Sequence, residues 1–110
     1  MVDSTLSVAM ANYNHGRFIG EALEAILAQS LRPLEIIVVD DASTDDSVEI
    51  VEGIARRDPI VRLVRNERNL GAVRTIDLGL REAAGDYVFF PASDDRVMAG
   101  LFAKSMNLLN

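Results

Sequence analysis

A run of four β-branched residues that ends in two carboxylates constrains this chain more than any other stretch. Ile36–Val39 leads directly into Asp40 and Asp41, and a polar turn follows over residues 42–45. A short aliphatic run bounded by turn residues is typical of a strand buried on both faces. Ligands of open α/β sheets bind beyond the carboxyl ends of the parallel strands. We therefore expect the two carboxylates to lie at a ligand-binding edge.

Strand and helix signals alternate along the chain. Strands are expected over residues 6–11, 36–39, 60–65 and 86–91, with Asp40 and Asp41 just past the end of the second. Helices are expected over about residues 17–29, 46–57, 71–84 and 99–109. This order predicts an α/β fold with a parallel sheet of about four strands and helices on both faces. Right-handed crossovers place the carboxyl ends of all strands at one edge, where the polar clusters 12–14, 40–41 and 94–95 should meet.

The third predicted helix has an apolar stripe at helical spacing. We expect this stripe to be the face that packs against the sheet. Its members are Val73, Ile76, Leu80, Ala83 and Ala84. Gly85 then stands where a helix commonly ends.

Composition excludes several classes of function. The net charge of −6 argues against nucleic acid as a partner, because phosphate neutralisation needs clustered Lys and Arg. The chain has no cysteine, which excludes disulfides, thiolate metal sites and cysteine catalysis. The turn after the first strand has a single glycine, Gly16, and the only lysine is Lys104, so neither a Rossmann dinucleotide motif nor a P-loop is present.

Length and hydropathy indicate one domain covering residues 1–110. No stretch approaches the ~20 apolar residues of a membrane span, and residues 1–5 do not resemble a signal peptide. We expect a cytoplasmic location, with the inner face of the membrane as the second option for a longer parent protein.

Carboxylates that converge on one sheet edge need a counter-charge. Mg²⁺ and Mn²⁺ prefer carboxylate oxygen and commonly share it with substrate phosphates. Asp40 and Asp41 have a second interpretation as acceptors for a base N–H or for ribose hydroxyls. Each residue also has a structural alternative: Asp40 as the end of a strand, Asp94 and Asp95 as helix caps, and Tyr13 as a core residue rather than a platform for a base.

Taken together, the motifs resemble family 2 glycosyltransferases. The resemblance rests on Ser7-Val8 with residues 12–14, on residues 22–30, on Glu35–Asp45, on Arg65–Gly71, and on Gly85-Asp86-Tyr87 with Ser93-Asp94-Asp95. It covers nearly the whole chain. It implies a Rossmann-like GT-A fold whose amino-terminal half binds a nucleotide-diphosphate sugar, commonly a uridine one.

The resemblance also implies roles for individual residues. Tyr13 would stack on the base, Asp41 would contact its polar edge, and Asp95 would ligate a Mg²⁺ or Mn²⁺ ion and the diphosphate. Sugar transfer to an acceptor hydroxyl, on a saccharide, lipid or protein, would invert the anomeric carbon. The expected substrate-binding residues are Asn12, Tyr13, Asn14, Asp40, Asp41, Arg74 and Asp94, and the expected metal ligands are Asp94 and Asp95.

Some positions depart from the family pattern. Ala92 replaces the first acid of the usual acidic motif, and Ile76-Asp77 replaces an Arg-Asn pair whose charge Arg74 would supply. Residues 96–110 contain no Asp or Glu to act as the general base of an inverting transfer. We therefore expect a donor-binding part without its acceptor-binding part, inactive alone. The alternative is a non-catalytic nucleotide-binding module.

A part of this kind would expose surface that its missing half covers. Self-association through an apolar patch is therefore expected as well. The candidate residues for that patch are Phe102, Met106, Leu108 and Leu109.

Overall fold

The computed structural model describes residues 5–29 and 32–91 of the chain. Asp94, Asp95, the expected last helix and the apolar patch around Phe102 lie outside these described residues. The elements are β1 (Leu6–Asn12), α1 (Ile19–Leu27), β2 (Glu35–Asp40), α2 (Ser47–Arg57), β3 (Val61–Arg65), α3 (Ala72–Glu82) and β4 (Tyr87–Phe89).

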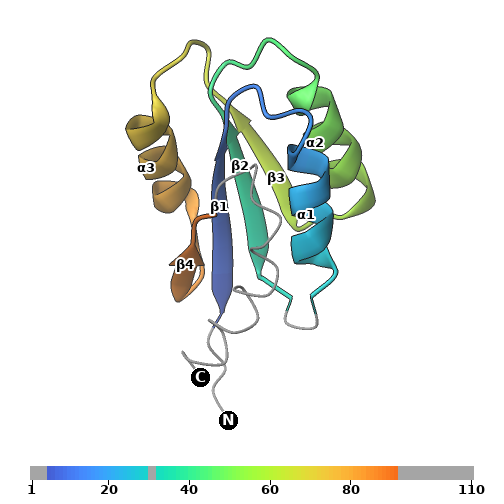
Figure 1. Cartoon of the computed structure of the whole chain (residues 1–110). Coiled ribbons are helices and arrows are strands. Elements are labelled where there is room, and N and C mark those ends of the chain that lie inside the picture. The colour runs from blue at the N-terminus through green and yellow to red at the C-terminus, as the bar shows by residue number, and fades with distance from the viewer. Residues whose placement is uncertain (1–4, 30–31, 92–110) are drawn as a thin grey trace.

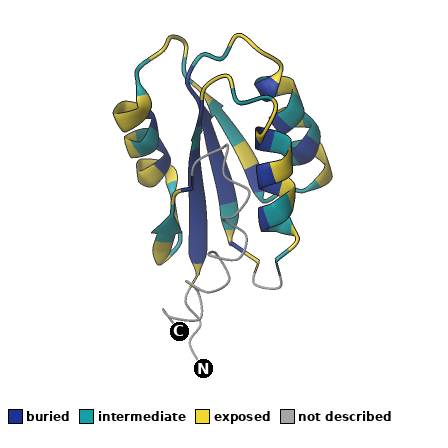
Figure 2. Ribbon diagram, viewed as in Figure 1, coloured by how far each residue is buried: buried dark blue, intermediate teal, exposed yellow. Residues whose placement is uncertain are grey.

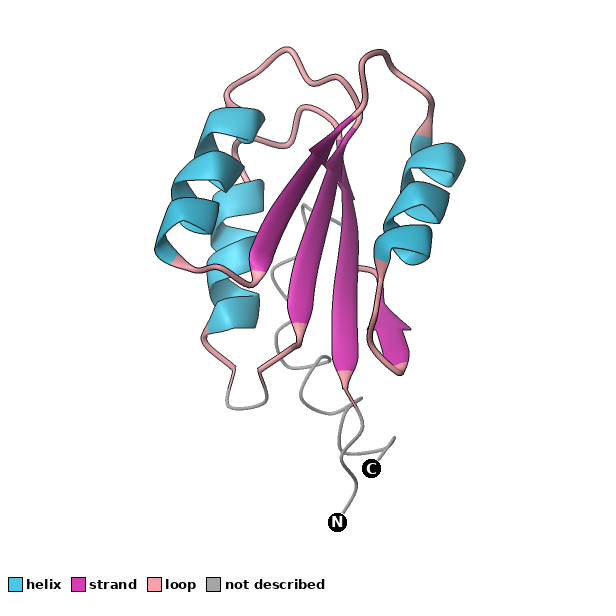
Figure 3. Cartoon of the chain, turned by 180° about the vertical axis from the view of Figure 1, so that it is seen from behind, coloured by secondary structure: helices cyan, strands magenta, loops and turns pink. Residues whose placement is uncertain are grey.

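The sheet has the predicted parallel architecture. Its strand order is β3-β2-β1-β4, and every described neighbouring pair is parallel. Helices α1 and α2 cover one face, and α3 covers the other (Figure 1). The α/β fold with helices on both faces of a four-stranded sheet is therefore confirmed. Seen from behind, the loops that follow β1, β2 and β3 gather at one end of the sheet (Figure 3).

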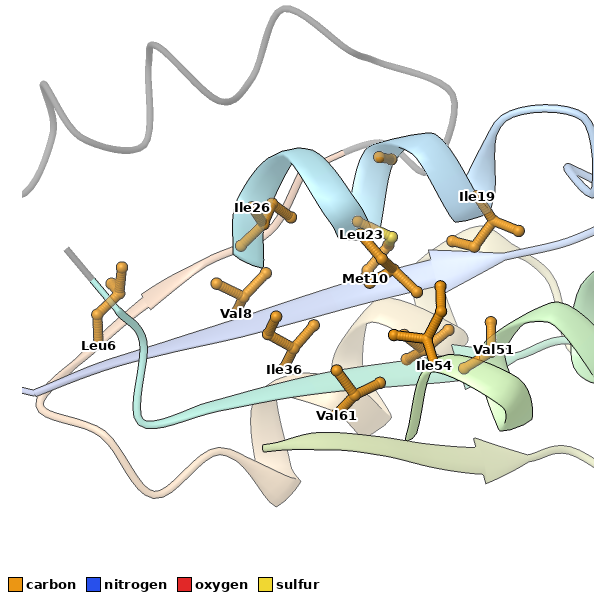
Figure 4. Close-up of a cluster of buried hydrophobic side chains, with 12 residues drawn as sticks. Leu6, Val8, Met10, Ile19, Leu23, Ile26, Ile36, Val51, Ile54 and Val61 are labelled. Atoms are coloured by element: carbon orange, nitrogen blue, oxygen red, sulfur yellow. The ribbon is translucent and has the colours of Figure 1, made fainter. Parts of the chain in front are cut away.

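The face under α1 and α2 holds a thick aliphatic core. Alternate residues of β1 and β2 point into it, among them Val8, Met10 and Ile36. Side chains of α1 and α2, including Leu23 and Ile54, close over them (Figure 4). Each such burial contributes about 1.5–3 kcal/mol. The central strands are consequently buried along their length (Figure 2), as the Ile and Val run of β2 predicts.

The face under α3 is built from smaller residues, and here the sequence prediction was wrong. Val73 is 85% exposed, and the helix buries Thr75 and Gly79 instead. A Cβ built on Gly79 would lie 3.1 Å from the Cβ of Ala9 and 3.5 Å from a methyl of Val39. The helix therefore comes close to the sheet through a residue without a side chain. Leu80 and Ala84 of the predicted stripe are exposed as well, and Ile76 and Ala83 are half-buried. The prediction failed because a periodicity argument gives no weight to Gly or Thr.

Polar groups join the end of α3 to the start of the sheet. Ser7 donates a hydrogen bond of 2.7 Å to Glu35, which also accepts one from the Ala84 N–H. The Gly85 N–H donates to the hydroxyl of Ser7 at 2.8 Å. A Cβ on Gly85 would lie 2.8 Å from the backbone nitrogen of Ser7, so only glycine fits.

Strand β4 is shorter than predicted and pairs with Leu6–Val8 at the beginning of β1. The expected range 86–91 was too long because Phe90 already leaves the ladder. In the described parts of the chain, no helix has the length and apolar character that crossing a membrane would require.

Candidate functional site

The ends of β1 and β2 bring two of the three predicted polar clusters together. Asn12 and Asp40 are partners in the parallel register, and the Asn12 Nδ2 donates to Asp40 Oδ1 at 2.8 Å. The backbone continues this pairing, since the Asp41 N–H donates to the Asn12 carbonyl at 2.9 Å. The predicted convergence is thus confirmed for residues 12–14 and 40–41. The third cluster, residues 94–95, lies outside the described ranges.

Asp40 is buried on the α1 and α2 side of the sheet, within a polar network. It is 2% exposed, and its two oxygens accept bonds from Asn12 and from both the N–H and the hydroxyl of Ser43. The amide of Asn12 also donates to the hydroxyl of Ser47 at the start of α2, at 2.9 Å. Asp40 and Asn12 therefore hold two loops and a helix in place. Contact of either residue with a substrate stays a prediction.

Asn14 links the same two loops from the outside. Its φ of 55° is left-handed, a conformation that Asn tolerates better than most residues. The Asn14 Oδ1 accepts bonds from the N–H groups of Thr44 (2.7 Å) and Asp45 (3.2 Å), and its own N–H donates to Ser43. The side chain is committed to loop structure, and a substrate contact is again untested.

Asp41 faces the opposite side, toward α3. Its Oδ1 accepts bonds from the Leu70 N–H at 2.7 Å and from Asn66 Nδ2 at 3.0 Å, and its Oδ2 accepts one from the Gly71 N–H at 3.0 Å. Burial acts to raise the pKa of Asp41, but these donors, with Thr75 nearby, together outweigh it and lower the pKa. Asp41 is therefore a carboxylate held in its charged form.

Beside Asp41 lies a cavity of about 360 Å³ between the loop after β1 and the start of α3. Tyr13 is 45% exposed at its rim, so one aromatic ring is accessible without unfolding. The lining combines this ring with a buried carboxylate, a mixture suited to a planar polar ligand. The lining residues are Ala11, Asn12, Tyr13, His15, Asp41, Asn69, Gly71, Ala72 and Thr75.

Carboxylates near this edge are engaged with protein donors rather than grouped for a cation. Asp45 accepts bonds from the N–H groups of Ser47 and Gly16. Burial acts to raise the pKa of Asp45, yet the bonds from Ser47 and Gly16 together lower it. Over residues 5–29 and 32–91, no group of three His, Cys, Asp or Glu side chains is placed to hold a metal ion. A metal at Asp94 and Asp95 is untested by the described geometry.

Arg74 lies on the first turn of α3, is exposed, and does not line the cavity. Asp77, at one of the positions where the family pattern differs, forms an ion pair of 2.8 Å with Arg81 on its own helix. Sequence reasoning missed Asn66, Asn69 and Thr75, which surround Asp41. The polar turn at residues 66–69 was the available signal for the two asparagines. Thr75 gave no signal, because a single Thr within a helix is commonplace.

The chain matches a protein family over most of its length. A family model described as glycosyl transferase family 2 matches residues 7–110. The chain belongs to this family. An uncharacterized glycosyltransferase of Haemophilus influenzae is 34% identical over 94% of this chain, and glycosyltransferase GlyG of Streptococcus pneumoniae is 39% identical over 84%. The match spans 42% of the Haemophilus influenzae protein and 31% of GlyG, so this chain corresponds to less than half of either relative.

Solved structures agree with this assignment and show the GT-A fold. Staphylococcus aureus TarS 1–349 in complex with UDP-GlcNAc superimposes with a TM-score of 0.77 at 29% identity, over 94% of this chain and 31% of TarS. The mannosyltransferase PcManGT from Pyrobaculum calidifontis, in complex with GDP-Man and Mn²⁺, gives a TM-score of 0.78 at 28% identity. That match covers 90% of this chain and 31% of PcManGT.

Proposed function

We propose that this chain is the donor-binding part of a family 2 glycosyltransferase and that its donor is a UDP-sugar. The observation that carries the proposal is the cavity that the ionised Asp41 and the accessible Tyr13 line together. A ring at the rim and a hydrogen-bond acceptor inside are the two features that recognise a nucleobase by stacking and by its polar edge. The diphosphate and sugar would extend from the cavity along the sheet edge.

Counting acceptor positions supports uracil as the base. A carboxylate offers about four lone-pair positions, and three protein donors reach Asp41. One position is left on Oδ2, which suits the single ring N–H of uracil better than the adjacent N–H and NH₂ donors of guanine. The likeness to TarS, solved with UDP and with UDP-GlcNAc, agrees with this choice.

The remaining parts of the proposal concern the metal and the transfer step. A Mg²⁺ or Mn²⁺ ion held by Asp94 and Asp95 would neutralise the diphosphate leaving group, in keeping with the Mn²⁺ found with PcManGT. We propose an inverting transfer to an acceptor hydroxyl, with the general base outside these 110 residues. The chain alone would then bind donor and transfer nothing. A cytoplasmic location and self-association through the patch around Phe102 complete the proposal.

A second candidate function is a nucleotide-sugar binding module without catalysis. The ion pair of Asp77 with Arg81 favours it, because one of the two positions that carry Arg-Asn in the family pattern is engaged away from the cavity. Full-length protein with a UDP-sugar and mixed acceptor hydroxyls separates the two functions. Release of UDP that depends on acceptor supports the transferase, and tight donor binding without release supports the module.

The direct test is calorimetric titration of UDP into the purified chain, with and without Mn²⁺. We expect Mn²⁺-dependent binding in the wild type and its loss in Asp95→Ala. Asp46→Ala serves as the matched control, because Asp46 is exposed and makes no side-chain cap bond at α2. A folded sample that binds no UDP would overturn the proposal.

A further inference from the structure

Two side chains outside the predicted site stand directly behind the Asp41 carboxylate. Asn66 follows β3, and Thr75 belongs to α3, where it is 1% exposed. The Asn66 Nδ2 lies 3.0 Å from Asp41 Oδ1 and 3.2 Å from Thr75 Oγ1. One amide group therefore joins the end of β2 to the third helix.

One pattern of donation satisfies every hydrogen bond in this group. The Thr75 hydroxyl donates its only proton to the carbonyl of Gly71 at 2.8 Å, so it meets Asn66 as an acceptor. The two protons of the Asn66 amide then go to Thr75 and to Asp41. Asn66 thus donates to Asp41 and to Thr75, and Thr75 donates to Gly71. If the O and N of the Asn66 amide were exchanged, its oxygen would lie against the Asp41 carboxylate, and neither group could donate.

This arrangement decides which oxygen of Asp41 remains available. Asn66 and the Leu70 N–H occupy Oδ1, whereas Oδ2 has only the Gly71 N–H. Gly71 itself has a φ of 93°, a conformation suited to glycine, and its carbonyl is tied to Thr75. Rotation of the carboxylate would break bonds on both of its oxygens.

We propose that Asn66 and Thr75 are positioning residues for nucleobase recognition, which hold the Asp41 carboxylate so that Oδ2 points its remaining acceptor position at a base N–H in the cavity. The inference rests on the proposed function, because it presumes a nucleotide in that cavity. Asn66 reaches the ligand only through Asp41, and Thr75 acts mainly through Asn66 and Gly71. Thr75 also lines the cavity wall.

The charge state of Asp41 agrees with this role. Burial acts to raise the pKa of Asp41, and the bonds from the Leu70 N–H, the Asn66 amide and the Gly71 N–H act to lower it, with a net lowering. Loss of the Asn66 amide would leave the Asp41 carboxylate less firmly oriented and its charged form less stabilised. The expected consequence is poorer reading of the base N–H rather than loss of the whole ligand.

The test compares UDP with UDP methylated at N3 of uracil, which lacks the ring N–H, titrated into the chain in the presence of Mn²⁺. In the wild type we expect the methylated ligand to bind about tenfold more weakly, the loss of one hydrogen bond to a charged group. In Asn66→Ala and Thr75→Val we expect UDP to bind about tenfold more weakly than it binds the wild type. We also expect the preference for UDP, the Kd of the methylated ligand divided by the Kd of UDP, to fall toward one. Thr75→Ser, which keeps the hydroxyl, should retain the preference.

The outcomes separate the inference from the function on which it rests. A folded wild type that binds no UDP overturns both. A wild type that binds the two ligands equally, or folded variants that keep the full preference, overturn the inference alone. A purely structural role would lower the melting temperature of the variants and leave the preference for UDP unchanged.

Discussion

Asp40 and Asp41 are neighbours in the chain, yet they belong to two different regions of the molecule. Asp40 points into the network under α1 and α2, where Asn12 and Ser43 use both of its oxygens. Asp41 points toward α3, where three donors hold it beside a cavity. Two identical side chains at the carboxyl edge of one sheet thus have different surroundings: Asp40 joins the loops, and Asp41 lines a cavity.

The packing beneath each carboxylate explains the difference. Long aliphatic side chains such as Met10 and Leu23 fill the α1 and α2 side up to the polar network. On the α3 side, Gly79 lets the helix approach Ala9 closely, and the cavity opens where α3 begins. The face under α1 and α2 therefore stabilises the sheet edge, and the face under α3 leaves room for the cavity.

The sharpest way to break this comparison is to remove Asp40. Asp40→Ala removes the acceptor of one buried bond from Asn12 and of two half-buried bonds from Ser43, so we expect the free energy of unfolding to fall by about 3 kcal/mol. Urea unfolding followed by circular dichroism measures it. Asp46→Ala, on the same loop and exposed, should change it by less than about 0.5 kcal/mol. Equal effects of the two variants would show that the network around Asp40 does not stabilise the edge.

One substitution made in two helices tests the packing of the two faces. Gly79→Leu must displace Ala9 and Val39, and we expect a loss of about 1–3 kcal/mol in stability. Gly53→Leu in α2 meets only the end of Arg56 at 4.0 Å and should stabilise by up to about 1 kcal/mol. Thermal unfolding of both variants decides the matter, and a stabilised Gly79 variant would contradict the close approach of α3.

Tyr13 tests the ligand side of the comparison without disturbing the fold. Its ring is 45% exposed, so Tyr13→Ala should leave the melting temperature almost unchanged. Loss of base stacking should weaken UDP binding by about 1–2 kcal/mol, which is roughly a five- to thirtyfold rise in Kd. Phe18→Ala is the control, since Phe18 is an exposed aromatic residue that does not line the cavity. If calorimetry found the same UDP affinity for Tyr13→Ala and Phe18→Ala, Tyr13 would not be part of the nucleotide site.

The smallest expected effect is a change in acid sensitivity. The pKa of Asp41 is lowered from 3.8 in the folded state, so the unfolded chain binds the proton more readily. Asp41 therefore contributes stability above about pH 4, and the contribution is lost as the pH falls through its folded-state pKa. Unfolding free energies from pH 2 to 6 should depend less steeply on pH in Asp41→Asn. Parallel profiles for the two proteins would contradict this assignment, and Asp45 should leave a residual slope in both.

Local pattern was enough to predict much of the fold. The Ile and Val run predicted the position of β2, although the strand also includes Asp40, which was expected just past its end. The alternation of elements predicted a parallel sheet covered on both faces. The same pattern placed residues 12–14 beside residues 40–41, because parallel strands end at a common edge. It failed at α3, where periodicity pointed to Val73 while Thr75 and Gly79 face the sheet.

By itself, the sequence determined the order of the elements, the edge at which polar groups gather, and the resemblance to a glycosyltransferase family. Only the tertiary structure decided that Asp40 serves the loops, that Asp41 faces the cavity, and that Asn66 and Thr75 stand behind it. The physical reason is that hydrophobic periodicity and turn chemistry act between residues close in the chain. The partners of a buried polar group come from distant segments, and each of those hydrogen bonds is stronger in the low-dielectric interior than in water.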